Sequence, residues 1–175
     1  MAKTSATKFK WFWAWQDEKE EAWLREMSRK GYHLLSVGLP CIYTFTIGEP
    51  RDYVYRLDYQ PYTKKDMNDY LQLFQDAGWE HIGVMNAWQY FRKEAREGEA
   101  PEIFTDIESK VEKYKRILMY LWIFFLPLLT VLIITWNRNP YPWLTGIKIF
   151  ILAVVLLLTY AIIRIASRIK KLRRF

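Results

Sequence analysis

A short acidic run supplies the side chains with the clearest potential for chemistry. Residues 17–21 read DEKEE, and neighbouring carboxylates are common in metal sites and in acid–base pairs. The same run lies where a helix is expected to begin, and acidic residues in a first helical turn are favoured by the helix dipole alone. We therefore interpret the run as a helix start and not as a site.

The other reactive residue types are few and widely spaced. The chain has one cysteine, Cys41, and two histidines, His33 and His81, which fall short of a zinc cluster. Cys41 lies in an alternating apolar run, which favours packing over nucleophilic attack. The sequence contains neither a glycine-rich phosphate loop nor a G-x-S-x-G elbow. We therefore expect that the protein is not an enzyme and that it has no metal or cofactor.

The positive charge of the chain lies in its C-terminal part. The net charge is +7, yet residues 1–100 hold 14 Lys and Arg against 15 Asp and Glu. A nucleic-acid-binding domain would carry basic residues on its own folded surface, whereas basic residues that flank apolar blocks are typical of membrane proteins. Nucleic acid is therefore not an expected partner.

Two apolar blocks follow the N-terminal part. Residues 117–136 contain no charged side chain and are long enough to cross a hydrocarbon layer of roughly 30 Å. Residues 144–164 form a second block of this kind, with Lys148 near its start. Residues 137–143 supply a turn between them. The sequence predicts a two-helix transmembrane hairpin that serves as an anchor, because neither span has the internal acid, base or histidine that a transport pathway uses.

Basic residues at the outer ends of the hairpin predict its orientation. Positive charge precedes the first span and follows the second, so the N- and C-termini should both face the cytosol, with residues 137–143 outside a cytoplasmic (inner) membrane that the chain crosses more than once. Residues 165–175 then form a basic cytosolic tail. Its candidate contacts with anionic membrane lipid are Arg168, Lys170, Lys171, Arg173 and Arg174.

One segment of the N-terminal part occurs twice. The pairs related by a shift of 47 residues include Leu24 and Leu71, Met27 and Phe74, Gly31 and Gly78, Leu35 and Ile82, and Tyr43 and Tyr90. In each copy the apolar residues recur at helical spacing, and the glycine comes where a left-handed C-terminal cap belongs. We therefore predict two equivalent helices, the first with a capping-box-like start at Asp17 and Glu20.

Between and around these helices the period changes to two. Alternation of this kind indicates strands at residues 9–15, 37–47, 53–59 and 82–90. The resulting order, βαββαβ, is a tandem βαβ repeat. It predicts an α+β, ferredoxin-like sandwich over residues 1–94, with four antiparallel strands and both helices on one face. Residues 95–116 would then form a linker and a juxtamembrane helix.

The face of this sheet that the helices leave open is a candidate binding surface. The residues expected there are Lys10, Phe12, Thr44, Arg56, Asp58, Gln89 and Phe91. A surface of mixed polar and apolar character suits association with a partner protein or with a second copy of the chain. It does not resemble the aromatic face on which RNA-recognition modules stack bases.

Three stretches of this sequence resemble a known family. The runs EEAWLREMSRKGYHL, YTFTIGEPRDYVYRLDY and LFQDAGWEHI are similar to those of bacterial membrane proteins whose cytosolic part is a domain of unknown function, number 2812. The resemblance covers roughly residues 8–95. It implies a Gram-positive source, genes beside PadR-type repressors, and a regulatory or envelope-stress context. It implies no catalytic residue.

We therefore expect a membrane-anchored, non-enzymatic regulatory or adaptor protein whose cytosolic domain binds a partner protein. Two alternatives stay open. In the first, the domain is a sensor that binds a small hydrophobic molecule between sheet and helices. In the second, the protein is an accessory subunit of a transporter and uses its spans as the interface. An internal cavity would favour the sensor.

Overall fold

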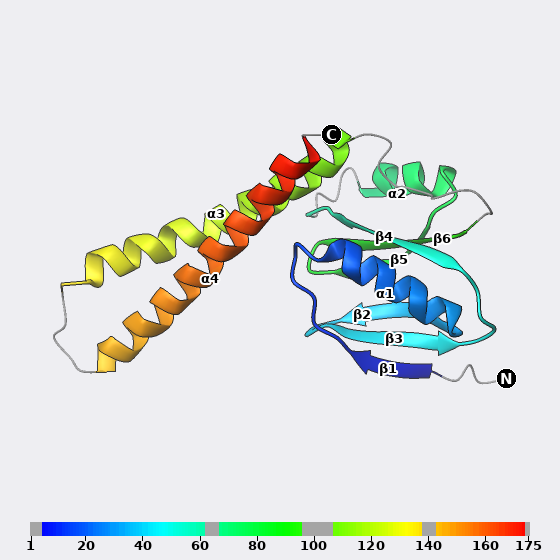
Figure 1. Cartoon of the computed structure of the whole chain (residues 1–175), viewed down its shortest axis with the longest axis horizontal. Helices are drawn as coiled ribbons and strands as arrows, with labels where there is room; N and C mark the ends of the chain where they lie inside the picture. Colours follow the sequence, from blue (N-terminus) through cyan, green and yellow to red (C-terminus); the bar gives the residue numbers. More distant parts are fainter. Residues whose placement is uncertain (1–4, 62–66, 96–106, 138–142, 174–175) are drawn as a thin grey trace. The chain divides into compact units, whose positions relative to one another are not determined.

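A computed structural model describes residues 5–61, 67–95, 107–137 and 143–173. The chain divides into two compact units, residues 1–105 and residues 106–175. The first is an α+β unit and the second is a pair of long helices (Figure 1). Residues 96–106 of the predicted linker and juxtamembrane segment at 95–116, most of the turn at 137–143, and Arg174 lie outside the described residues.

The first unit contains two copies of the same βαββ arrangement. The first copy consists of β1 (Ser5–Phe9), α1 (Asp17–Arg29), β2 (Tyr32–Gly38) and β3 (Ile42–Ile47). The second consists of β4 (Tyr53–Tyr59), α2 (Met67–Asp76), β5 (Glu80–Met85) and β6 (Trp88–Glu94). Each copy forms an antiparallel three-stranded sheet, in the orders β1-β3-β2 and β4-β6-β5.

Local geometry confirms the predicted repeat. Gly31 and Gly78, which are equivalent under the shift, have φ angles of 81° and 79°, and only glycine adopts this region without strain. A register shift at residue 35 of β2 recurs at residue 82 of β5, and these positions are also equivalent. The duplication therefore preserves the helix ends and the bulges of the strands.

The strands differ from the prediction in number and extent. Residues 37–47 and 82–90 were each expected to form one strand, but both belong to hairpins, with turns at 39–41 and at Asn86–Ala87. The second turn has φ angles of 48° and 69°, as a two-residue hairpin turn requires. The expected strand at 9–15 ends at Phe9. Six strands in two sheets therefore replace four in one, and the ferredoxin-like sandwich is not confirmed.

The second hairpin is one residue shorter than the first. Leu34 faces Phe45 across β2 and β3, and its equivalent His81 faces Phe91 across β5 and β6. Phe45 therefore matches Phe91, which lies 46 residues later. The predicted match of Tyr43 with Tyr90 is wrong, because the shorter turn moves the whole last strand by one position.

The two helices pack against opposite faces of the second sheet. Core residues on the α1 side include Leu24 from α1, Leu57 from β4 and Tyr90 from β6. On the α2 side, Phe74 packs with Val54 and Phe91. Neighbouring residues of a strand point to opposite faces, so the prediction that both helices share one face is wrong. α1 also contacts β2 of its own sheet and thus lies between the two copies.

Side chains connect the two sheets where β2 lies beside β5. The backbone N–H of Leu34 in β2 donates to the Tyr55 hydroxyl at 3.3 Å. The carbonyl of Leu34 accepts a longer bond from Arg92 Nη1 at 3.4 Å. These bonds satisfy backbone groups on the outer edge of β2, which would otherwise be exposed or unpaired.

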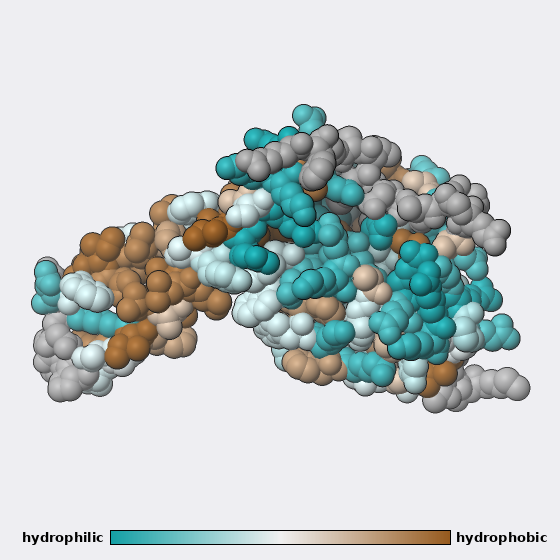
Figure 2. Space-filling model, in the orientation of Figure 1, coloured by the Kyte–Doolittle hydropathy of each residue, from teal (hydrophilic) through white to brown (hydrophobic). Residues whose placement is uncertain are grey.

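The second unit consists of α3 (Ile107–Thr135) and α4 (Trp143–Leu172), which pack side by side. Both helices are long and apolar enough to cross a membrane, and only 11% and 17% of their most apolar windows are buried. Their exposed side chains form the apolar surface in Figure 2. Pro127 lies within α3, and its missing N–H removes one helical hydrogen bond.

The predicted juxtamembrane helix is continuous with the first span, because α3 begins at Ile107. Arg168 of α4 donates from Nε to the Tyr114 hydroxyl of α3 at 2.9 Å. The other described candidate lipid contacts, Lys170, Lys171 and Arg173, are exposed on the last turns of α4. Arg168 therefore has a protein partner, whereas the other three side chains are accessible.

Candidate functional site

The predicted open face does not exist as one surface. Asp58, Gln89 and Phe91 are 2%, 1% and 0% exposed, because α2 covers this side of the second sheet. The Tyr70 hydroxyl of α2 donates to Asp58 Oδ2 at 2.9 Å, and Phe74 packs on Phe91 with ring centroids 4.5 Å apart. For these three residues the expected exposure is wrong.

The other four predicted residues lie in separate surroundings. Phe12 packs against Trp23 and Tyr43 at the edge of the main core. The ammonium of Lys10 lies 4.8 Å from the ring of Trp23. Arg56 approaches Glu21 of α1 at 3.4 Å, and Thr44 is half-buried on β3. No common binding surface follows from these positions.

The residues first considered for chemistry are also separated. Within the described parts of the chain, no group of three His, Cys, Asp or Glu side chains is placed to hold a metal ion. Cys41 is buried, and burial raises the pKa of its thiol. His81 Nε2 is 2.9 Å from Gln89 Oε1, while His33 Nε2 donates to the carbonyl of Glu49 at 2.8 Å.

One cavity of the first unit lies where the two copies meet. This junction cavity has a volume of about 620 Å³. It is lined by His33, Leu34, Leu35, Thr46, Ile47, Gly48, Glu49, Arg51, Tyr53, Glu80, His81, Ile82 and Arg92. Three pairs in its wall are related by the shift of 47 residues: His33 with Glu80, Leu34 with His81, and Leu35 with Ile82. The duplicated bulges therefore shape this cavity.

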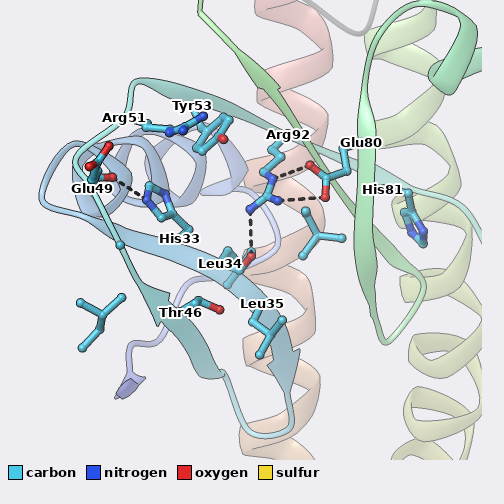
Figure 3. A pocket seen from close by; sticks show the side chains of 13 residues that line it. His33, Leu34, Leu35, Thr46, Glu49, Arg51, Tyr53, Glu80, His81 and Arg92 are labelled. Carbon is cyan, nitrogen blue, oxygen red and sulfur yellow. Dashed lines mark hydrogen bonds and ion pairs between the residues drawn. The ribbon is translucent and has the colours of Figure 1, made fainter. Parts of the chain in front are cut away.

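Two charged residues of the junction cavity, Arg92 and Glu80, bind each other. Arg92 donates from Nε and Nη2 to the two carboxylate oxygens of Glu80 at 2.7 and 2.8 Å (Figure 3). Its guanidinium also lies 4.9 Å from the ring centroid of Tyr53. In Figure 3 the His81 ring points away from these groups. A ligand that used either charge would have to replace a bidentate ion pair.

A second, smaller cavity lies at the other end of α1 and is mainly aromatic. This aromatic cavity has a volume of about 240 Å³. It is lined by Trp11, Phe12, Trp13, Ala14, Asp17, Glu20, Leu39, Pro40, Cys41, Tyr43, Met85, Asn86, Trp88 and Tyr90. The segment before α1, the first turn of α1 and both hairpins contribute. Like the junction cavity, it is formed by both copies of the repeat.

A buried carboxylate lies in the wall of the aromatic cavity. Glu20 is 6% exposed, and its Oε1 accepts hydrogen bonds from the hydroxyls of Tyr43 and Tyr90, each at 2.7 Å. Its Oε2 accepts no hydrogen bond from the residues that the structure describes. A carboxylate has capacity for about four hydrogen bonds, so part of this capacity is unused.

The surroundings of Glu20 shift its titration. Burial raises the pKa of the Glu20 carboxyl above its ordinary value, and the negative charge of Asp17 acts in the same direction, while the two tyrosine donors oppose the shift. Burial and the charge of Glu20 raise the pKa values of Tyr43 and Tyr90 far above the ordinary range. Both phenols therefore stay protonated and keep donating to Oε1.

Sequence reasoning placed Glu20 at a capped helix start and missed its burial. The N-cap of α1 is Gln16, without a side-chain cap bond, so the predicted capping box is wrong. One signal was present in the sequence. Glu20, Leu24 and Met27 follow the spacing i, i+4, i+7 and therefore lie on one helical face, which places the carboxylate beside two core residues.

Comparison with known proteins identifies a family without an assigned activity. A profile of the family described as "Protein of unknown function (DUF2812)" matches residues 16–126, from the start of α1 into α3. No curated protein and no solved structure matches the chain. Because the match covers well over half of the chain, the protein belongs to the DUF2812 family.

Proposed function

We propose that the protein is a membrane-anchored, non-enzymatic sensor whose N-terminal unit binds a small molecule in the aromatic cavity. The observation that carries this proposal is the aromatic cavity, whose wall combines aromatic side chains with the carboxylate of Glu20. Small-molecule sites are concave and mostly apolar, with a few polar groups that fix the orientation of the ligand.

The junction cavity supports the proposal less well, although its volume falls within the range usual for ligand sites. Arg92 and Glu80 in its wall neutralise each other, so this ion pair leaves no net charge for a ligand to bind. The predicted binding of a partner protein stays a prediction without a defined surface, because three residues of the expected face are buried. The role of transporter subunit likewise stays a prediction.

Helices α3 and α4 would anchor the sensor in the bacterial cytoplasmic membrane with both termini in the cytosol. Their low burial favours this, since the core helix of a soluble protein would be mostly buried. The basic residues Lys110, Lys113 and Lys115 precede the first apolar stretch, as a cytosolic flank does.

Cysteine labelling of intact cells tests the orientation. In a Cys41→Ser background, a membrane-impermeant maleimide should label Asn137→Cys directly. It should label Ser36→Cys, in the first unit, only after the membrane is permeabilised. Labelling of Ser36→Cys in intact cells would contradict the orientation.

Ligand screening of the full chain in detergent tests the sensor. Trp11, Trp13 and Trp88 line the aromatic cavity, so their fluorescence should report occupancy by members of a panel of small cationic, neutral and anionic aromatic compounds. Two matched variants locate the site. Ala14→Trp would fill the aromatic cavity, and Leu35→Trp would fill the junction cavity.

We expect Ala14→Trp to abolish binding and Leu35→Trp to leave it within about twofold of wild type, because the two cavities share no lining residue and distant sites act independently. The reverse pattern would assign the ligand to the junction cavity and overturn the proposed site. Absence of binding by every compound in the panel would overturn the sensor.

A further inference from the structure

We infer that the first copy of the repeat docks on an anionic lipid bilayer through an exposed apolar patch at one end of its sheet. This end patch consists of Phe9, Trp11, Trp13, Leu39 and Ile42. Docking places these side chains among the lipid headgroups, a depth that tryptophan rings favour. The inference rests on the proposed anchoring by α3 and α4, and it adds a second membrane contact, made by the N-terminal unit.

The exposure of the end patch distinguishes the first copy from the second. Phe9 is 66% exposed and Trp11 is 52% exposed. Single exposed apolar residues are normal on a soluble protein, whereas a group of them marks an interaction surface. Within the described residues of the second copy, Leu73 is the one large apolar side chain that is exposed. The end patch therefore calls for a partner that the second copy does not need.

Backbone pairing brings the two ends of the patch together. Phe9 is the last residue of β1 and lies opposite Ile42, the first residue of β3. The N–H of Lys10 then donates to the carbonyl of Cys41 at 3.2 Å, which keeps the chain after β1 beside the turn that contains Leu39. Figure 1 shows that β1 and β2 end on this same side of the first sheet.

A ligand in the aromatic cavity does not account for the end patch. Trp11, Trp13 and Leu39 line that cavity, but Phe9 and Ile42 do not. A molecule that fits a volume of about 240 Å³ would leave the latter two side chains exposed to water. The occupant is therefore an extended surface that covers the whole patch.

The charge around the end patch favours an anionic surface. Residues 1–16 and 31–48 contain the three strands of the first sheet, and they hold three Lys and no Arg, Asp or Glu. Lys8 and Lys10, on either side of Phe9, are exposed. Each basic residue near an anionic membrane strengthens binding by about fivefold. A second copy of the patch would instead bring the same positive charge and be repelled.

The chain itself keeps the end patch within reach of a bilayer. Residues 96–106 join the first unit to α3, and a chain of this length spans at most roughly 40 Å. Once α3 and α4 are in the membrane, the effective concentration of lipid around the first unit is high. A contact of a few apolar and basic side chains is then sufficient for docking.

Quenching by spin-labelled lipid tests the docking, with the full chain in vesicles of phosphatidylcholine and phosphatidylglycerol. A nitroxide on the lipid headgroup quenches a fluorophore close to it. Both leaflets carry the nitroxide, so either orientation of the protein is reported. In a Cys41→Ser background, the fluorophore is attached at Phe9→Cys or, as the matched control, at Leu73→Cys. These residues are 66% and 67% exposed and belong to different copies.

We expect the label at Phe9→Cys to be quenched at least about twice as strongly as the label at Leu73→Cys, because only the former would lie at headgroup depth. Replacing phosphatidylglycerol by phosphatidylcholine should reduce this difference, since the attraction of the lysines is lost. Equal quenching at the two positions would overturn the docking. A difference that does not depend on phosphatidylglycerol would overturn the preference for anionic lipid.

A pair of serine variants locates the contact. Trp11→Ser should reduce the quenching at Phe9→Cys by about half or more, because it removes a large ring from the patch. Leu35→Ser is the matched control, since Leu35 is 55% exposed on the first copy and lies outside the end patch. It should leave the quenching unchanged. Equal effects of the two variants would show that the end patch is not the contact.

Dilution of the protein in the vesicles distinguishes lipid from a second copy of the chain. Quenching by lipid should not depend on the ratio of protein to lipid. Protection of the Phe9→Cys label at high protein density, relieved by dilution, would assign the patch to a homodimer and overturn the docking on lipid.

The proposed function is tested separately from this docking. Extraction of the full chain from vesicles by alkaline carbonate would overturn the anchor, and failure of the compound panel would overturn the sensor. A carbonate-resistant chain with equal quenching at Phe9→Cys and Leu73→Cys would overturn the docking alone.

Discussion

Helices α1 and α2 are equivalent in the repeat and end at equivalent glycines, yet they are buried differently. The buried residues of α1 are Asp17, Glu20, Glu21, Leu24, Met27 and Ser28, whereas α2 buries Phe74 alone. Both helices cover their own sheet with an apolar face. Only α1 has a second sheet against its polar side, because it lies between the copies.

The polar side of α1 is used for specific contacts with β4 and the residues before it. Glu21 Oε1 accepts from the backbone N–H of Leu57 at 2.8 Å. Arg25 and Arg29 both bind the carboxylate of Asp52. Among the described residues, their equivalents in α2, Gln72 and Asp76, bind only each other, at 2.7 Å. Equivalent faces of the two helices thus differ in their surroundings: this face contacts the neighbouring copy in α1 and solvent in α2.

The largest difference between the copies should come from the helix-ending glycines. Both Gly31→Ala and Gly78→Ala place a side chain at positive φ, at about 1–2 kcal/mol. A Cβ at Gly31 would also lie 2.4 Å from the backbone oxygen of Gly48, while at Gly78 the nearest atom, 3.5 Å away, ends a flexible lysine. Urea unfolding in detergent should show a loss of at least about 3 kcal/mol for Gly31→Ala and about half of that for Gly78→Ala. Equal losses would contradict the asymmetry.

The second contrast concerns the carboxylate that joins α1 to β4. Glu21→Ala leaves the buried N–H of Leu57 without its acceptor and removes one partner of Arg56, at 3.4 Å. We expect a loss of about 3 kcal/mol in the free energy of unfolding. Asn68→Ala, at the equivalent exposed position of α2, should change it by less than about 0.5 kcal/mol. Comparable effects would show that α1 does not dock through Glu21.

A smaller effect is expected at Ser28, near the end of α1. Its hydroxyl donates to the carbonyl of Arg51 at 2.5 Å and accepts from the N–H of Tyr53 at 3.2 Å. Ser28→Ala should lower the free energy of unfolding by about 1–2 kcal/mol, because the buried N–H loses its acceptor. Gln75→Ala is the control in α2 and should be near neutral in the same unfolding assay. An unchanged free energy of unfolding in Ser28→Ala would contradict the contrast between α1 and α2.

The smallest effect is a pH dependence at Asp52. Hydrogen bonds from Arg25 and Arg29 hold the pKa of the Asp52 carboxyl well below its usual range. Its stabilisation should be complete above the unfolded-state pKa of about 3.9 and should be lost as pH falls through the lower folded-state pKa. The Asp52 side chain is 35% exposed, so solvent screening limits the effect to about 1 kcal/mol or less.

The difference in unfolding free energy between wild type and Asp52→Asn measures this contribution. It should be present at neutral pH and should shrink as pH falls below about 4. A pH-independent difference would show that the arginines do not act through the charge of Asp52.

Prediction from the sequence succeeded where a feature depends on local pattern. The left-handed glycines 31 and 78 were predicted because no other residue type adopts that conformation without strain. The strands were harder, because alternation continues through both hairpins and concealed their turns. Tyr43 and Tyr90 were matched on residue type. That match was wrong because the second turn is one residue shorter than the first.

Prediction failed for the binding surface and for the candidate site. Phe91 was expected to be exposed because both helices were placed on the other face of the sheet, but α2 covers the face that carries Phe91. Glu20 was interpreted as part of a helix start because the helix dipole alone favours acidic residues in a first turn. The helical face of Glu20 was visible in the sequence. The two tyrosines that donate to its carboxylate, however, come from strands that lie far from Glu20 in the sequence.

The sequence by itself determined the duplication, the ends of the two short helices and the two long apolar helices. Each of these depends on periodicity or on one residue's own conformational preference. Only the tertiary structure decided that α1 lies between two sheets, that α2 covers one of them, and that Glu20 meets Tyr43 and Tyr90 beside an aromatic cavity. Burial depends on which surfaces the rest of the protein covers. Equivalent residues of α1 and α2 therefore have different neighbours, because α1 lies between the two sheets and α2 covers only one of them.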